Sequence, residues 1–574
     1  MATLAQLSGR PATRADVPLS GLLRDQVGHA AAALWRSRIV LVFTFVLPLI
    51  WLVMIGLVAG DEVVDPATGI RTMQYVTPMA AVLGLVFAAY PPVATALALA
   101  REQLILKRVR GTPLPGWTYL VAQVGAAGLL AAAALVVMLV LGVAAYGIEI
   151  QWHTALASIV TLGLGIACLA SLGLAVGAVA PSASSAQAFT MASAVLMGFV
   201  SGLFRVGSQE PAWMAQVGGL FPMRNIADPL RDQFDPRTVG AGWDRGALAV
   251  LLAWAIGGLL VAAWALGREP RVAAATSPEA GPGATPRLVA AVGSLRAVAV
   301  ARPTILRLAI DQAGWAMRVA RRNPSTMFFG IVMPIGLYAL VCSMYPAPTD
   351  QIHDMPIGVW FAGAMTAYGA GVIAFMHLPA SLAAARERGT LKRLRGTPVP
   401  ALAFIAGRVI EVVVLAAVIA ILMLGVGSLA FGVRIAAEAL PTAAAVLLLG
   451  TLSLAACGFA LLALVPTARA VSVLTLAILL PLSFVSDIFV AGGIPEPVSA
   501  FASIFPLKHV VAALGAALNG GQPSWLDVTV VAAWMVVASV VAVRGFRWES
   551  APGEAPAPGA VRRGRRRRGA HSPG

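Results

Sequence analysis

Twelve apolar runs, each near the roughly 20 residues that a membrane-spanning helix needs, dominate this sequence. Of its 574 residues, 59% are hydrophobic and 11% are charged, whereas a soluble domain carries roughly a quarter charged residues. We therefore predict an all-α polytopic membrane protein. The runs lie at about 39–59, 76–99, 118–146, 155–179, 187–204, 246–266, 326–345, 357–380, 403–431, 440–465, 470–490 and 525–544.

A basic motif of 15 residues follows the second apolar run of each half of the chain. One copy runs from Arg101 to Pro115 and the other from Arg386 to Pro400, and ten positions are identical without a gap. Asp25-Gln26 recurs as Asp311-Gln312 at nearly the same offset. The repeat covers nearly the whole chain, which indicates an internal duplication of a six-helix unit.

The repeat and the changes in composition define five segments. The segment 1–38 holds the N-terminus and a helical pattern from Leu19 to Arg38, which fits either a helix in the membrane interface or a simple lead into the first span. The other four are a first six-helix half at 39–267, a linker rich in Pro, Gly, Ala and Arg at 268–302, a second half at 303–548, and a basic tail at 549–574.

The distribution of Lys and Arg predicts the orientation. Both motifs, the linker and the tail are basic, whereas the alternate loops carry acidic residues such as Glu62, Glu149 and Asp354. The positive-inside rule then places both termini in the cytoplasm of a multi-pass protein of the cell (plasma) membrane. Because six is even, the two halves should be parallel, related by a pseudo-two-fold axis along the membrane normal.

Two segments, at about 205–240 and 491–523, are too polar to span cleanly but contain apolar stretches. They fit segments that enter the outer leaflet and return, which requires protein to cover their irregular backbone. Ordinary extracellular loops are the alternative.

The second motif has the pattern of a short amphipathic helix. Leu391 and Leu394 fall on one face, and Arg388, Lys392 and Arg395 line another. Such a helix would lie flat beneath the bilayer and could dock another protein. Membrane anchoring alone would also require positive charge, but not the same order of residues in two copies.

The end of each motif predicts a sharp helix break. Gly396 suits a left-handed helix stop, and Thr397-Pro398 suits an N-cap followed by proline at the first helical position. Gly111, Thr112 and Pro113 repeat this pattern.

Several function classes lack support in the sequence. The net charge of +16 lies in short blocks beside apolar runs, which favours membrane lipid rather than nucleic acid as the contact. Cys168, Cys342 and Cys457 lie inside apolar runs without a metal-binding spacing. No lysine follows a glycine, so the phosphate-binding loop of an ATPase is missing. We predict no cofactor or metal in this chain.

The motif resembles the loop between the second and third spans in permease subunits of ABC-2 type exporters. Arg386 to Arg395, followed by Thr-Pro, carries the resemblance, and the stretch from Phe484 to Phe489 is similar to the fifth span of that family. Large fused permeases of drug and polyether-antibiotic exporters of actinomycetes are similar in organisation. The first copy departs from the pattern, with Gln103 and Leu104 where Arg388 and Gly389 stand.

The resemblance implies that each motif is a coupling helix that contacts a separate ABC ATPase subunit, present in two copies, which binds ATP and Mg²⁺. A hydrophobic small molecule or lipid would be exported between the two halves. The residues assigned to ATPase coupling are Arg101, Glu102, Lys107, Arg108, Arg110, Arg386, Glu387, Arg388, Lys392, Arg393 and Arg395.

A few polar and aromatic residues inside the spans are candidates for function. Glu411 follows Arg408 by one turn, and an ion pair within the helix is the favoured interpretation. Asp487 replaces Gly202 and fits either a boundary residue or part of an exit gate, and His377 fits a packed polar residue better than a proton relay. Four aromatic residues could line a substrate path or pack in the core: Phe199, Phe204, Phe484 and Phe489.

Two other functions compete with an ATP-driven export permease. A proton-driven multidrug transporter with twelve spans also has a basic loop after its second span, but its usual motif contains an aspartate that neither copy has here. A membrane scaffold or sensor that transports nothing is the third candidate.

Overall fold

The structure, a computed structural model, describes residues 19–60, 62–65, 69–111, 116–203, 211–268, 304–344, 351–397, 399–489 and 495–545. Several sequence predictions lie wholly or partly outside these residues: the first 18 residues of the N-terminal segment, the linker apart from its first residue, the basic tail, Phe204, the Thr112-Pro113 pair, the proline at position 398, and the first residues of the segments 205–240 and 491–523.

The first half consists of helices and one small hairpin. Its elements are α1 (Leu19–Trp35), α2 (Arg38–Leu41), η1 (Val42–Val46), α3 (Leu47–Ala59), β1 (Val63–Asp65), β2 (Ile70–Arg71), α4 (Thr72–Ala89), α5 (Pro91–Glu102), α6 (Ile105–Arg110), α7 (Gly116–Tyr146), η2 (Trp152–Thr154), α8 (Ala155–Val179), α9 (Ala183–Val200), α10 (Ala212–Gly219), α11 (Pro222–Phe234) and α12 (Arg245–Gly267).

The second half repeats this order. Its elements are α13 (Ile305–Arg321), α14 (Pro324–Met327), η3 (Phe328–Val332), α15 (Met333–Met344), β3 (Gln351–Ile352), β4 (Met355–Pro356), α16 (Ile357–Gly371), η4 (Val372–His377), α17 (Leu378–Glu387), α18 (Thr390–Arg395), α19 (Ala401–Phe431), α20 (Ala439–Leu464), α21 (Ala468–Val485), α22 (Glu496–Ala502), α23 (Pro506–Leu518) and α24 (Trp525–Gly545).

Helices cover most of each of the twelve predicted runs, but twelve crossings are not confirmed. In the described ranges, nine helices are long and apolar enough to cross a membrane, or ten if α22 and α23 are taken as one bent span. Shorter apolar helices of 10–17 residues cover the other three runs: Val42–Leu57, Phe328–Ser343 and Ala470–Val485. Each of these windows lies within a longer continuous helical stretch: Arg38–Ala59, Pro324–Met344 and Ala468–Val485, respectively.

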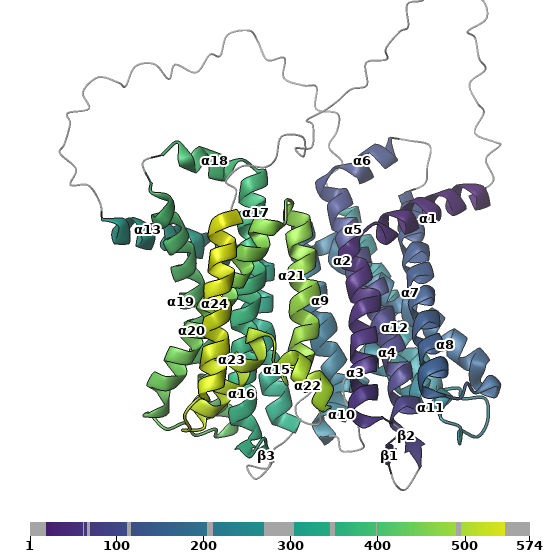
Figure 1. The fold of residues 1–574 in the computed structure, drawn as a ribbon. Coiled ribbons are helices and arrows are strands. Elements are labelled where there is room, and N and C mark those ends of the chain that lie inside the picture. Colours follow the sequence, from purple (N-terminus) through teal and green to yellow (C-terminus); the bar gives the residue numbers. More distant parts are fainter. Residues whose placement is uncertain are drawn as a thin grey trace, which may run out of the picture.

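The long helices run side by side, with the short basic helices α6 and α18 at one end and the hairpins at the other (Figure 1). We call these the basic end and the far end. The two hairpins are antiparallel; β1 pairs with β2 (Val63 with Arg71), and β3 pairs with β4 (Ile352 with Met355). Helices α1 and α13 lie across the basic end, where α1 packs on α7 and α13 packs on α19.

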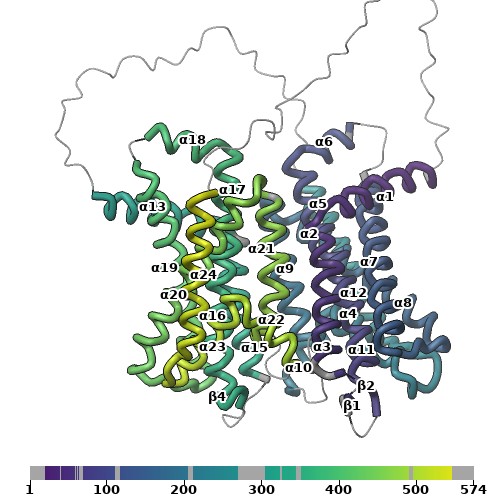
Figure 2. Tube along the Cα trace, in the orientation of Figure 1, coloured from purple at the N-terminus to yellow at the C-terminus, as the bar shows by residue number. Residues whose placement is uncertain are grey.

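The fifth helix of each half packs against the other half. Helix α9 contacts α14 and α15, and α21 contacts α3. Leu480 and Phe484 of α21 belong to the core of the first half, whereas Val195 and Phe199 of α9 pack on the core of the second half. Figure 2 shows α9 and α21 at the boundary between the two halves. The halves therefore share a reciprocal interface.

The segments after the fifth helices fold back at the far end (Figure 1). Helices α22 and α23 meet at 98°. Most of α23 is buried, and it packs on α16, α20 and α24. In the first half, α11 packs on α4 and α8. This protein cover is the condition that the predicted entering and returning segments must meet.

Small residues allow close contact between the second and fourth helices. A Cβ added at Gly173 or Gly177 of α8 would lie 2.7 Å or 2.5 Å from a backbone oxygen of the second span. Gly458 of α20, at the position equivalent to Gly173, would meet the carbonyl oxygen of Ala374 at 2.9 Å. The second and fourth helices therefore approach each other closely in both halves.

Candidate functional site: two basic helices and a cavity between the halves

Helix α18 presents its basic side chains outward and its leucines inward. Leu391 is buried and Leu394 packs on the core, whereas Arg388, Lys392 and Arg395 are exposed. Arg393 is exposed as well. The amphipathic helix predicted from the spacing is confirmed.

Helix α6 is the less basic counterpart and has the same length of six residues. Lys107 and Arg108 are exposed, and Leu106 packs on the core of the first half. The side chain of Arg110 is outside the described part of the structure, and Gln103 takes the place of Arg388. The second half therefore offers the more positive surface.

Helix α18 ends at Gly396 as predicted, but the left-handed conformation predicted for this glycine is wrong. Gly396 has φ −80°, and the left-handed residue of this segment is Gly389, which precedes α18 with φ +68°. Thr397 does not cap the next helix either, because its hydroxyl donates to the carbonyl oxygen of Leu394 (2.6 Å). Helix α19 starts only at Ala401. The left-handed turn of the motif therefore lies before α18, at Gly389, and Thr397 binds a carbonyl group at the C-terminal end of α18.

Two of the predicted coupling residues in the second motif bind the turn between the fourth and fifth helices, Arg386 from a buried position and Glu387 from the surface. Arg386 is 6% exposed, and its Nη2 donates to the carbonyl oxygens of Val465 (2.7 Å) and Pro466 (2.6 Å). Oε1 of Glu387 accepts a hydrogen bond from the backbone N–H of Ala468 (2.7 Å). Both side chains hold the turn between α20 and α21.

The first motif makes the same contacts. Nη1 of Arg101 donates to the carbonyl oxygens of Gly177 and Ala180, at 3.0 Å each. Oε1 of Glu102 accepts from the backbone N–H of Ala183 (2.8 Å). The sequence groups these two pairs with the exposed cations, because spacing does not show which charged side chains bind backbone groups of the same chain.

A cavity of about 330 Å³ lies between the two halves. Its lining comes from the first, second and fifth helices of both halves. The lining residues are Phe43, Leu47, Phe87, Gln187, Met191, Val195, Asn323, Thr326, Phe329, Met333, Tyr368, Val372, Met376, His377, Ala380, Ser472, Leu476, Leu479 and Leu480.

Equivalent positions of the two repeats both contribute to the lining of this cavity. The pairs are Phe43 with Phe329, Leu47 with Met333, Phe87 with Val372, Gln187 with Ser472, Met191 with Leu476, and Val195 with Leu480. The cavity therefore lies on the pseudo-two-fold axis, which is where an internal duplication places a shared path.

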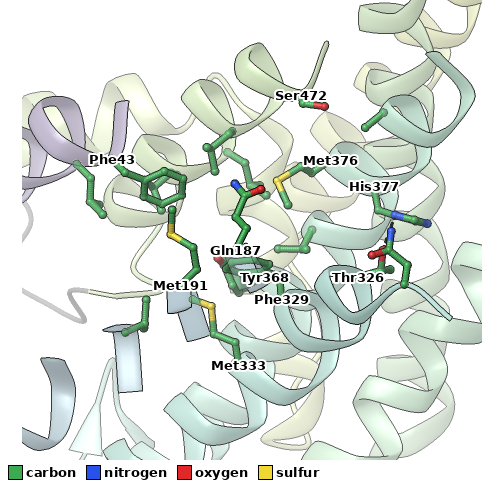
Figure 3. A pocket seen from close by; sticks show the side chains of 18 of the residues that line it. Phe43, Gln187, Met191, Thr326, Phe329, Met333, Tyr368, Met376, His377 and Ser472 are labelled. Carbon is green, nitrogen blue, oxygen red and sulfur yellow. Dashed lines mark hydrogen bonds between the residues drawn. The ribbon is translucent and has the colours of Figure 1, made fainter. Parts of the chain in front are cut away.

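One wall of the cavity is more polar than the rest. Thr326 and His377 come from the second half and are hydrogen-bonded, with 2.8 Å between Oγ1 and Nδ1. Figure 3 shows them together at one edge, with Phe43 and Met191 at the opposite edge. The equivalent residues of the first half are Val40 and a proline, so this polar wall has no counterpart there.

The phenylalanines predicted for a substrate path are not among the lining residues where the structure describes them. Phe199 and Phe484 pack between the halves. Phe489 lies 5.1 Å from the ring centres of both Phe484 and Tyr368. The aromatic lining comes instead from Phe43, Phe87, Phe329 and Tyr368. One feature of the sequence could have predicted this lining: phenylalanine recurs at the equivalent positions 43 and 329 of the two repeats.

The remaining polar candidates have local roles. Nη1 of Arg408 lies 2.6 Å from Oε2 of Glu411, which is fully buried, so the predicted ion pair is confirmed. Asp487 has φ +59° and Gly202 has φ +71°, so both occupy the same left-handed turn after the fifth helix. The backbone oxygen of Asp487 also accepts a hydrogen bond from Trp360 Nε1 (3.3 Å).

Repeated apolar helices around an axial cavity, with basic helices at one end, define a duplicated α-helical membrane permease. Comparison with protein families identifies it more closely: residues 30–234 and 315–518 match the ABC-2 type transporter family. The chain belongs to this family, and two matched regions show a fused two-half permease. Membership implies an ABC ATPase partner. A comparison with curated proteins finds no significant match.

Proposed function

We propose that this permease exports a hydrophobic or amphipathic compound, such as a drug, an antibiotic or a lipid-like molecule, across the cell membrane. The cavity is the observation that carries the proposal. Its walls are mostly apolar, and its lining includes neither a lysine or arginine nor a carboxylate among the described residues. Such a site suits an uncharged apolar body whose hydrogen-bonding group faces Thr326 and His377.

The position of the cavity favours export. Its lining on α9 comes from the second, third and fourth turns after the basic end, at Gln187, Met191 and Val195. Towards the far end, Phe484 and Phe489 pack against the neighbouring helices. With the basic end in the cytoplasm, as the charge distribution predicts, the cavity is poised to take its ligand from the inner side.

The energy source in this proposal is the ATPase partner, bound in two copies to α6 and α18. Lys107 and Arg108 on α6, and Arg388, Lys392 and Arg393 on α18, form two exposed basic surfaces. Closure of the ATPases around ATP and Mg²⁺ would move both helices together. A basic surface of this kind fits an acidic groove on the partner.

Inside-out vesicles containing the permease and its ATPase test the function. We expect ATP-dependent uptake of a neutral hydrophobic dye that persists when an ionophore collapses the proton gradient. Met191→Trp should fill the cavity and reduce uptake by about tenfold or more, because a large ring does not fit a closed apolar site. Leu260→Trp, on an exposed face of α12, is the matched control. Uptake driven by a proton gradient without the ATPase would contradict the proposal.

A further inference from the structure

We infer that the Arg–Glu pair that opens each motif is a positioning pair that transmits movement of the basic helix to the cavity. The pairs are Arg101–Glu102 and Arg386–Glu387, and we call each one a clip. This inference rests on the proposed function for its transport readout, but its structural basis is independent of the cargo.

Each clip spans the two helix ends at the turn between the fourth and fifth helices. In the second half, Arg386 donates to Leu462, Val465 and Pro466, whose carbonyl groups lie at the C-terminal end of α20. The last carbonyl groups of a helix have no partner within it and carry partial negative charge. A buried guanidinium therefore satisfies these groups and matches their charge.

Glu387 acts on the other side of the same turn. Its carboxylate accepts from the N–H of Ala468, the first residue of α21. Thr467 caps the same helix end by accepting from Ala470 (3.2 Å). The first N–H groups of a helix carry partial positive charge, so an anion is favoured here. Two adjacent residues of opposite charge thus bind two helix ends of opposite polarity.

The first half repeats the arrangement with different neighbours. Arg101 binds the carbonyl groups at the end of α8, and Glu102 binds Ala183, the first residue of α9. Ser182 caps α9 by accepting from Ser185 (3.1 Å). Duplicated geometry around turns with different sequences, Ala-Pro-Ser and Val-Pro-Thr, indicates a specific role for the charge pair.

The clip connects the exposed basic helix to the cavity wall. Only Arg388 and the left-handed Gly389 separate Glu387 from α18. On the other side, α21 runs from the clip to Ser472 and Leu476, which line the cavity one and two turns later. The same helix packs against α3 of the first half. Movement of α18 would therefore reach both the cavity and the opposite half through two hydrogen-bonded side chains.

This placement separates positioning from docking within one motif. Arg386 is too buried to meet a partner protein and Arg101 is half-buried, whereas Lys392 and Arg393 are exposed. Glu102 and Glu387 are exposed as well, but the carboxylate of each accepts a hydrogen bond from the N–H at the start of a helix. We therefore expect substitutions at the clip to uncouple ATP hydrolysis from transport while the ATPase stays bound. Substitutions on the exposed face should instead release the ATPase.

Hydrogen exchange of the purified permease tests the structural step. Glu387→Ala should speed exchange at the start of α21 by about tenfold, as expected when a charge-assisted hydrogen bond is lost. Glu102→Ala should do the same at the start of α9. Glu387→Gln, which keeps an acceptor oxygen, should change exchange less. Glu438→Ala, an exposed glutamate just before α20, controls for loss of charge. Unchanged exchange in both alanine variants would overturn the inference.

Vesicles containing the ATPase test the functional step. For Glu102→Ala plus Glu387→Ala we expect the amount of dye moved per ATP to fall by about tenfold, with ATPase retention within about twofold of the wild type. Lys392→Ala plus Arg393→Ala should lower retention without altering exchange. Loss of ATPase binding in the clip variant, or full transport per ATP, would overturn the inference. Absence of ATP-driven uptake by the wild type would refute the proposed function but not the structural part of this inference. The hydrogen-exchange result would still decide whether the clip orders α9 and α21.

Discussion

The residue before each basic helix has a backbone conformation that sets the direction of that helix. Gly389 has φ +68° and Leu104 has φ +58°. Glycine adopts this conformation freely, whereas a side chain costs about 1–2 kcal/mol. The first half therefore keeps the same turn at a cost, which indicates that packing around α6 determines its direction.

Substitutions at these two residues should differ in their effect on stability. A Cβ at Gly389 would meet no atom within 4 Å, so any loss in Gly389→Ala reports backbone strain alone. We expect a loss of about 1 kcal/mol for Gly389→Ala and no loss for Leu104→Gly. Thermal unfolding of the purified protein in detergent measures both. An unchanged midpoint for Gly389→Ala would show that this turn relaxes.

The buried Arg408–Glu411 ion pair is a second feature at the scale of residues that should affect stability. Glu411 is 0% exposed, and Arg408 also donates to the hydroxyl of Ser381. Two buried opposite charges stabilise each other, whereas a buried charge that has lost its partner strongly destabilises the folded protein.

Removing one partner should therefore be worse than removing both. We expect Glu411→Ala to lower the free energy of unfolding by about 3–5 kcal/mol, and Arg408→Met plus Glu411→Leu to lower it less. The thermal midpoints and yields of folded protein distinguish these variants. Equal losses in the single and double variants would mean that water reaches Arg408.

At the scale of elements, contact between the second and fourth helices depends on glycines at matched positions. Gly173 and Gly458 are equivalent in the repeat, and both face backbone or proline atoms of the second span. Association of helices in lipid depends on such close packing, because apolar side chains gain little by leaving lipid for protein.

A side chain at these glycines should push the helices apart. We expect Gly177→Val to cost about 1–3 kcal/mol, the usual range for overpacking, because its Cβ would lie 2.5 Å from the carbonyl oxygen of Ala94. Gly163→Ala on the same helix has open space around its Cβ and should be tolerated. Detergent-resistant folding after heating compares the two. Equal tolerance would show that α8 can shift outward.

At the scale of the whole molecule, the two halves hold each other through α9 and α21. Phe484 is buried in the core of the first half, and Phe199 packs on the core of the second. Because each half contributes one helix to the other, the interface does not require the covalent link between them.

The halves expressed as two separate chains should therefore assemble. We expect copurification of residues 1–285 with 286–574, and a several-fold loss for Phe484→Ala, since truncation of a buried aromatic ring at an interface is costly. Phe501→Ala is the matched control, because that ring is 57% exposed. Failure of the wild-type halves to copurify would show that the linker is needed for assembly.

The apolar runs and the repeat predicted most of the architecture. The fourth run was predicted at 155–179, and α8 has those bounds. The amphipathic face of α18 was also predictable, since Leu391 and the basic residues differ in polarity. The inward direction of Arg386 was not, because its partners are carbonyl groups about 80 residues away that carry no sequence signal.

The sequence by itself determined that this chain is a duplicated bundle of membrane helices. Each helix satisfies its own backbone in lipid, so length and hydrophobicity are sufficient to define it. Only the tertiary structure decided which apolar side chains line the cavity and which charges bind helix ends. The spans are apolar on all sides, and the rotation of one span against another depends on close packing between residues far apart in the chain.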